Sequence, residues 1–181
     1  MVNSSHVLIF SGSLLTKTHE PAAIGALLAH VTAHYNIRGA QLFDNRFIWG
    51  KRHLYSAVWH AYHAATHNQM ISKTLSMEML LYAAGQRQIQ KAIEILGVRS
   101  STRSLAGVIL GDNLTPLREA YAYLRDVLDM QEDISLLNQY NLKRDFVLTN
   151  LVELEVEHRE MTDLDIEKAV LQRVGTLALE R

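Results

Sequence analysis

The chain has 181 residues, of which 48% are hydrophobic and 20% charged, a composition typical of a globular domain and not of a disordered chain. Eighteen basic and nineteen acidic residues give a formal net charge of −1, so a nucleic-acid contact would require a local basic patch. The absence of cysteine excludes a disulfide scaffold, a thiolate nucleophile and zinc sites built on cysteine.

The first third of the chain alternates short apolar runs with stretches of helical periodicity. In chain order we predict a strand at Val7–Phe10, a turn at Ser11–Ser13, a helix at Pro21–Tyr35, a strand at Ala40–Asp44 and a helix from Asp44 or Asn45 to about His67. Pro21 suits the first turn of its helix, and Asp44 or Asn45 can cap the next one.

The rest of the chain is mainly helical in pattern. We predict helices at Ser76–Ala84, Arg87–Leu96, Pro116–Leu128, part of Asn141–Leu151 and Thr162–Val174, with strands at Leu105–Leu110 and Thr176–Leu179. Gly85 and Gly97 follow the first two helices, where a left-handed cap is expected. The pattern indicates an α+β fold, a single helix-rich domain over residues 1–181 with a small mixed or antiparallel sheet flanked by helices.

The common catalytic signatures are absent from the sequence. It contains no phosphate-binding loop of the G-x-x-x-x-G-K-[ST] type, no G-x-G-x-x-G after a strand, no H-E-x-x-H and no G-x-S-x-G turn. No apolar run reaches the roughly 20 residues that span a bilayer. We therefore expect a cytoplasmic protein without catalytic residues, bound metal or cofactor.

Two clusters of polar residues could nevertheless suggest a metal site. His53, His60, His63 and His67 fall on one side of a predicted helix, away from its apolar stripe, and we interpret them as a polar face rather than a zinc site. A second set, Asp126, Asp129, Glu132 and Asp133, has a spacing that could place carboxylates on one helix face for magnesium. A solvated helix face is the simpler interpretation, and a hydrolase or transferase using either cluster is the weakest hypothesis.

The central segment carries a more specific pattern. It reads Lys73-Thr74-Leu75, then Glu78, then Gly85-x-Arg87-Gln88-Ile89, then Ala92-Ile93 and Gly97, and is preceded by Gly50-Lys51-Arg52-His53-Leu54-x-x-Ala57. This pattern resembles the TPRKB-type kinase-binding subunit of the KEOPS complex, and Gly85–Ile89 is similar to the archaeal branch. The likeness is dense over Asp44–Leu110 and diffuse on both sides.

The resemblance implies a non-catalytic accessory subunit. KEOPS makes N6-threonylcarbamoyladenosine on tRNA, and in this family the subunit binds a small atypical kinase that acts as an ATPase. Through the kinase it contacts the other KEOPS subunits, and archaeal members also hold the single-stranded 3′ CCA end of tRNA. The family fold is a sheet flanked by helices, which agrees with the pattern of predicted elements.

The predicted tRNA-binding residues are Lys51, Arg52, Lys73, Thr74, Arg87 and Gln88. Lys73 and Arg87 precede two helices, where cations and exposed backbone N–H groups favour anions. The aromatic residues of the 49–62 segment could stack on bases, although core packing accounts for most such side chains. A purely protein-binding scaffold without RNA contact is the alternative. Glu78 and the apolar residues around it are expected to be structural.

Overall fold

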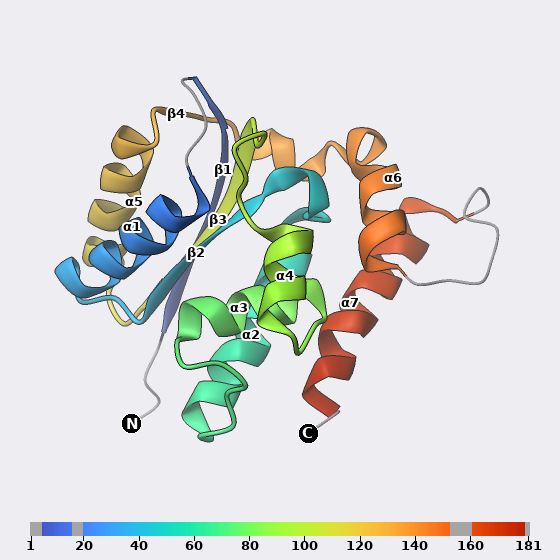
Figure 1. Cartoon of the computed structure of the whole chain (residues 1–181), viewed down its shortest axis with the longest axis horizontal. Helices are drawn as coiled ribbons and strands as arrows, with labels where there is room; N and C mark the ends of the chain where they lie inside the picture. The colour runs from blue at the N-terminus through green and yellow to red at the C-terminus, as the bar shows by residue number, and fades with distance from the viewer. Residues whose placement is uncertain (1–4, 16–19, 153–160, 180–181) are drawn as a thin grey trace.

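The protein folds as a four-stranded sheet with helices on both faces (Figure 1). The computed structural model describes residues 5–15, 20–152 and 161–179. The strands are β1 (His6–Leu14), β2 (Gly39–Asp44), β3 (Ser104–Gly111) and β4 (Met130–Glu132). They stand in the order β2-β3-β1-β4, and every neighbouring pair is antiparallel. The α+β prediction and its antiparallel sheet are confirmed.

Helices occupy most of the remaining described chain. They are α1 (Pro21–His34), α2 (Gly50–Thr66), α3 (Leu75–Ala84), α4 (Ile89–Leu96), α5 (Leu114–Val127), α6 (Tyr140–Leu151) and α7 (Asp163–Leu179), with 3-10 turns η1 (Asn45–Phe47) and η2 (Ile134–Asn138). Helices α1 and α5 cover one face of the sheet, and α2, α3, α4, α6 and α7 lie on the other side (Figure 1). Within the described ranges, no helix combines the length and apolar character needed to cross a membrane.

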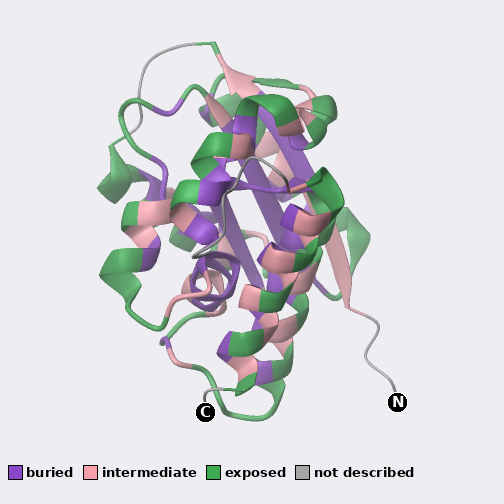
Figure 2. Ribbon diagram, turned by 90° about the vertical axis from the view of Figure 1, so that its right-hand side faces the viewer, coloured by how far each residue is buried: buried purple, intermediate pink, exposed green. Residues whose placement is uncertain are grey.

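The sheet separates two hydrophobic cores because its side chains alternate between the faces. On β3, Ala106, Val108 and Leu110 join the larger core, whereas Leu105 and Ile109 join the smaller one under α1 and α5. Figure 2 shows the consequence: the central strands β2 and β3 are buried, β1 is partly buried, and the helices turn exposed faces outward. A strand buried on both faces explains the continuous apolar run from which β3 was predicted.

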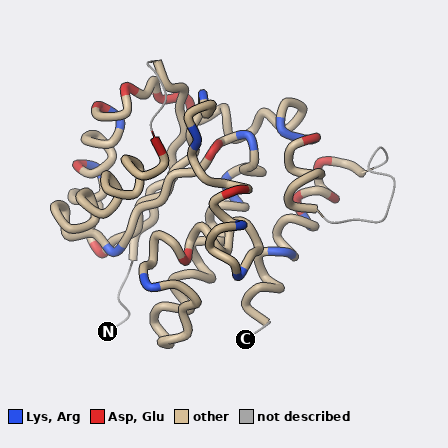
Figure 3. Tube along the Cα trace, in the orientation of Figure 1, with Lys and Arg blue, Asp and Glu red and all other residues tan. Residues whose placement is uncertain are grey.

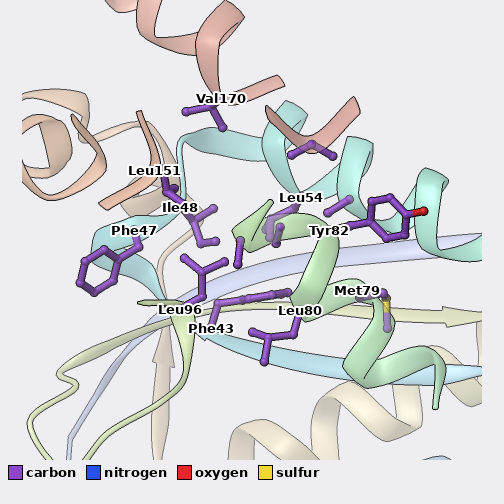
Figure 4. Close-up of a cluster of buried hydrophobic side chains, with 14 of the residues drawn as sticks. Phe43, Phe47, Ile48, Leu54, Met79, Leu80, Tyr82, Leu96, Leu151 and Val170 are labelled. Atoms are coloured by element: carbon purple, nitrogen blue, oxygen red, sulfur yellow. The ribbon is translucent and has the colours of Figure 1, made fainter. Parts of the chain in front are cut away.

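Helix α3 lies at the centre of the larger core. Its residues from Glu78 to Ala84 are all buried, and α3 packs against α2, α4, α7 and β2. Figure 4 shows Met79, Leu80 and Tyr82 of α3 among side chains from the sheet and the neighbouring helices. Burying a large apolar side chain contributes roughly 1.5–3 kcal/mol, so this helix is held by packing on nearly every side. The structural role predicted for the apolar residues of this helix is confirmed.

The predicted turn at Ser11–Ser13 is wrong, because β1 continues through it to Leu14. Gly12 pairs with Leu105 on one side and Glu132 on the other. A β-carbon at Gly12 would collide with the backbone of Gln131, so the glycine permits the close approach of β4. The small residues that suggested a turn instead allow β4 to pair with β1 as its second neighbour, opposite β3.

The chain after Asp44 and the C-terminal helix also differ from the prediction. Asp44 caps only the 3-10 turn η1, and α2 begins at Gly50, whose φ of 80° interrupts a continuous helix. The predicted strand at Thr176–Leu179 is wrong, because α7 runs on to Leu179 with Leu177 buried. Gly97 ends α4 with extended backbone rather than the expected left-handed cap.

Candidate functional site

An exposed aromatic pair marks the outer face of α2. Tyr55 and Trp59 are each 57% exposed although both are large and largely apolar. They stand one helical turn apart, so they share one face. They line a shallow hollow of about 760 Å³ together with Ile9 of β1 and Leu171 of α7. We call these four residues the α2 aromatic surface.

The other aromatics of this segment have structural surroundings. Trp49 is buried against the ring of Tyr140, with ring centres 4.8 Å apart. Tyr62 is partly buried and accepts a hydrogen bond from the Ser5 hydroxyl at 3.0 Å. The expectation that these aromatics pack in the core therefore holds for Trp49 and fails for Tyr55 and Trp59. Large exposed aromatic side chains are common at protein–protein contacts.

The edge of β1 lies beside the α2 aromatic surface. Strand β4 pairs with β1 only at Gly12–Leu14, so no described strand pairs with that edge over His6–Phe10. Val7 and the aromatic pair line a second hollow, of about 270 Å³, on the same side of the molecule. An incomplete strand edge next to exposed aromatic rings offers both backbone and apolar contacts to another protein.

Lys73 and Thr74 lie in the loop that precedes α3. Lys73 is exposed, and the Thr74 hydroxyl caps the helix by accepting a hydrogen bond from the Met77 N–H at 3.2 Å. The loop is fixed by Glu78, a fully buried carboxylate. Its oxygens accept the Ser72 N–H at 2.8 Å and the Ile71 N–H at 3.0 Å. Glu78 is thus structural, as predicted, but it acts through the loop rather than through the helix dipole alone.

Arg87 and Gln88 lie beyond the other end of α3. The helix ends at Gly85, which adopts the predicted left-handed conformation with φ 57°, and both residues are exposed before α4 begins. At 1.5 Å per residue, the ten residues of α3 place their two ends about 14 Å apart. Lys73 and Arg87 therefore do not meet in one anion site at adjoining helix starts.

Other basic residues gather near Arg87. The His53 ring contacts the Ala83 carbonyl oxygen at 2.8 Å, which places the start of α2, with Lys51 and Arg52, beside the end of α3. Arg52 is 73% exposed and pairs with Glu167 of α7 at 2.9 Å. One residue missed from the sequence joins them: Arg173 of α7, whose Nε lies 3.4 Å from the Ala84 carbonyl oxygen. We call Lys51, Arg52, Arg87, Gln88 and Arg173 the Gly85 cluster.

The histidines do not form a single polar stripe. His53 is only 1% exposed, so the prediction that it faces away from the core is wrong. His60 stacks on Tyr82, and the exposed His63 and His67 stack on each other with ring centres 4.1 Å apart. Among residues 5–15, 20–152 and 161–179, no three His, Asp or Glu side chains are grouped as a metal site would require.

The acidic residues that could have shared a helix face are dispersed. Asp126 lies in the last turn of α5 and pairs with Arg125 at 2.8 Å. Asp129 follows the helix with φ 47°, Glu132 lies in β4, and Asp133 caps η2 by accepting the Ser135 N–H. Because α5 ends at Val127, the helical spacing on which the magnesium hypothesis depends does not exist.

A buried lysine was missed from the sequence. Lys143 of α6 is 3% exposed, and its ammonium group donates hydrogen bonds to Asn45 Oδ1 at 2.9 Å and the Ile48 carbonyl oxygen at 3.0 Å. Burial lowers the pKa of Lys143 to about 7. Its three described hydrogen bonds hold η1, η2 and α6 together, so its role is structural.

Comparison with known proteins assigns the chain to a family. A comparison with curated proteins gives no significant match. The sequence model of the family described as kinase binding protein CGI-121 matches residues 17–176. This range contains α2, α3, α4 and the whole of the Gly85 cluster. The chain therefore belongs to the CGI-121 family of kinase-binding proteins.

Proposed function

We propose that this protein is a non-catalytic accessory subunit of a KEOPS-type tRNA-modification complex. In that role it binds the small atypical kinase and recruits tRNA by its 3′ CCA end for N6-threonylcarbamoyladenosine synthesis. The observation that carries the proposal is membership of a kinase-binding family across residues 17–176. The specific pattern from Lys73 to Gly97 supports the tRNA half of the proposal.

The α2 aromatic surface is the proposed contact for the kinase. Tyr55 and Trp59 are the kind of side chain that dominates protein interfaces, because each buries a large area with few rotatable bonds. Lys51 continues the same helix face one turn earlier and can supply a polar rim. The unpaired edge of β1 adds backbone groups beside them.

Isothermal titration calorimetry with the purified kinase subunit tests this surface. We expect micromolar or tighter binding with a negative heat-capacity change, since an interface of standard size buries roughly 1,200–2,000 Å². Trp59→Ser should weaken binding at least tenfold, as expected for a central aromatic residue. Leu142→Ser is the matched control, because Leu142 is 65% exposed on α6 and outside the surface. An equal loss of kinase affinity in Trp59→Ser and Leu142→Ser would contradict the assignment of the kinase contact to the α2 aromatic surface.

The Gly85 cluster is the proposed contact for tRNA phosphates. Three of its members are arginines or lysines from the predicted set, and all come from the ends of α2 and α3. Lys73 and Thr74 stand about 14 Å away at the other end of α3. A single-stranded 3′ end that contacts both the Gly85 cluster and Lys73 has to span that distance. The RNA path is therefore more extended than the sequence-based prediction of two adjoining helix starts implied.

A scaffold without RNA contact is the second candidate. Arg52 already pairs with Glu167, and basic and acidic residues are interspersed along the chain (Figure 3). With a net charge of −1 there is no general attraction to RNA. Under this alternative the kinase titration succeeds and removing the CCA end of tRNA has no effect, because the chain makes no specific contact with it.

Absence of turnover is the remaining expectation of an accessory role. The purified chain alone should hydrolyse no ATP and transfer no threonylcarbamoyl group. Activity that survives further purification and disappears with a point substitution in this chain would contradict the accessory assignment.

A further inference from the structure

A cavity between α1 and α3 contains no residue of the α2 aromatic surface or of the Gly85 cluster. It has a volume of about 470 Å³ and lies over β2, with α1 on one side and α3 and α4 on the other. Its walls are mainly aliphatic, including Ile24, Leu28, Leu80, Ile93 and Val98. A volume of this size with mostly apolar walls is typical of small-molecule sites, which range over about 300–1,000 Å³.

One polar side chain in this cavity lacks a partner. Gln41 of β2 lines the cavity and is only 6% exposed. The side-chain oxygen Oε1 of Gln41 accepts a hydrogen bond from the Leu42 N–H at 2.9 Å, which fixes the orientation of the side-chain amide. Within the described part of the chain, no group accepts a hydrogen bond from the Gln41 Nε2 amide. Because Gln41 lines the cavity and its Oε1 is already bonded, the N–H₂ group is the part of this side chain that remains available to a ligand.

The lining argues against two macromolecular occupants. It contains no described aromatic residue, whereas single-stranded bases are usually held by stacking on aromatic rings or arginine. An added β-strand is also disfavoured, because the Leu42 N–H at this edge is already bonded to Gln41. The described charged residue in the lining, Arg38, is paired with Asp112 at 2.7 Å. A neutral ligand therefore suits the cavity better than an ionised one.

From these contacts we propose that the α1–α3 cavity binds a neutral aliphatic small molecule that carries a hydrogen-bond acceptor such as a carbonyl oxygen. The aliphatic chain packs between Leu28 of α1 and Leu80 of α3, and the carbonyl oxygen accepts from Gln41 Nε2. This site is separate from the α2 aromatic surface and shares no residue with the Gly85 cluster. Binding there does not depend on the kinase proposal, and Thr74 is the residue that the cavity lining shares with the predicted tRNA-binding set.

Nuclear magnetic resonance of the labelled full-length chain tests the site with two probes. The first, 2-octanone, has an aliphatic chain and only an acceptor, while octylammonium has a similar chain and only donors. With 2-octanone, we expect saturable shifts of the Leu28, Leu80 and Ile93 methyl signals together with the Gln41 side-chain amide. Octylammonium should leave these signals unchanged.

Gln41→Glu separates the hydrogen bond from simple burial of the alkyl chain. The glutamate keeps an oxygen for the Leu42 N–H but replaces the donor with an acceptor. This variant should bind 2-octanone about tenfold more weakly, as expected for one lost hydrogen bond, and should gain affinity for octylammonium. Ala29→Phe, on the α1 wall, keeps Gln41 and should block 2-octanone by filling the cavity.

Three results would overturn the proposal. They are the absence of saturable shifts with 2-octanone, shifts that leave the Gln41 amide unmoved, and equal 2-octanone affinity in the wild type and Gln41→Glu. Saturable binding of an acetylated Val-Leu-Val peptide without binding of 2-octanone would identify a peptide groove instead. If Gln41→Glu fails to fold, the wild-type Gln41 shift and the Ala29→Phe variant still decide the outcome.

Discussion

Acid should destabilise this protein through one buried side chain, His53. Its Nδ1 accepts the Trp49 N–H at 3.1 Å, and its Nε2 lies 2.8 Å from the Ala83 carbonyl oxygen. These two contacts require the neutral tautomer with its proton on Nε2. A second proton would have to enter on Nδ1, directly against the Trp49 N–H. Burial lowers the pKa of His53 from 6.5 to about 4, despite the hydrogen bond to Ala83.

The magnitude and sign follow from that lowered pKa. As pH falls below 6.5, the unfolded chain binds a proton at His53 that the folded protein does not bind until about pH 4. The free energy of unfolding therefore decreases across this window and is restored as pH rises. A shift from 6.5 to about 4 corresponds to about 3 kcal/mol, a large part of a typical folding free energy of roughly 5–15 kcal/mol.

Denaturant unfolding between pH 7 and pH 4.5 measures this effect. The control is His53→Gln, because glutamine can accept from Trp49 and donate to Ala83 without titrating. Subtracting the two pH profiles removes the contribution of the other histidines and carboxylates. Below pH 6, the free energy of unfolding of the wild type should fall relative to that of His53→Gln by about 1.4 kcal/mol per pH unit. Parallel profiles, or a His53 titration near pH 6.5 by nuclear magnetic resonance, would refute this account of α2–α3 packing.

Three further predictions concern structural residues. Lys143 keeps a pKa of about 7 when folded against 10.5 unfolded, so the stability of the wild type relative to Lys143→Met should rise between pH 7 and 9, measured by denaturant unfolding. Glu78→Gln should cost about 2–3 kcal/mol and speed hydrogen exchange at Ile71 and Ser72, because charge-assisted hydrogen bonds are lost. Gly85→Ala should cost about 1–2 kcal/mol in the same unfolding assay, since φ is 57° there and Arg173 must move.

Local signals in the sequence predicted most elements of the fold. Periodicity identified the segments of α1, α3, α4 and α5, and the continuous apolar run identified β3. The three-residue strand β4 is too short to show an alternating pattern, so Met130–Glu132 was not predicted as a strand. At Gly175 a local helix-breaking signal was overridden, because Val174 and Leu177 on either side of it are buried in the core.

The candidate site was less predictable because it depends on which helix ends meet. Sequence spacing identified Lys73 and Arg87 as helix-flanking cations, but only the packing of His53 on Ala83 places the start of α2 beside the end of α3. Arg173 joins the cluster from α7, far along the chain, and no local signal distinguishes it. The burial of His53 likewise reflects a tertiary contact across 30 residues.

The tRNA role of the cationic residues can be resolved through salt dependence. Each phosphate contact with a single strand contributes a slope of roughly 0.7 in log affinity against log salt concentration. Lys73→Ala and Arg87→Ala should each make the slope shallower by about this amount. Arg118→Ala is the matched control, since Arg118 is an exposed residue of α5 on the opposite face of the sheet.

The most direct test of the accessory-subunit account compares binding of intact tRNA with binding of tRNA lacking its CCA end. Both RNAs are titrated into the wild type, the Lys73→Ala/Arg87→Ala double variant and Arg118→Ala. The account predicts that removing CCA weakens wild-type and Arg118→Ala binding strongly, and weakens the double variant much less. Wild-type affinity that is unchanged by CCA removal, with the same salt slope in the double variant, would contradict tRNA recruitment and leave a kinase-binding scaffold.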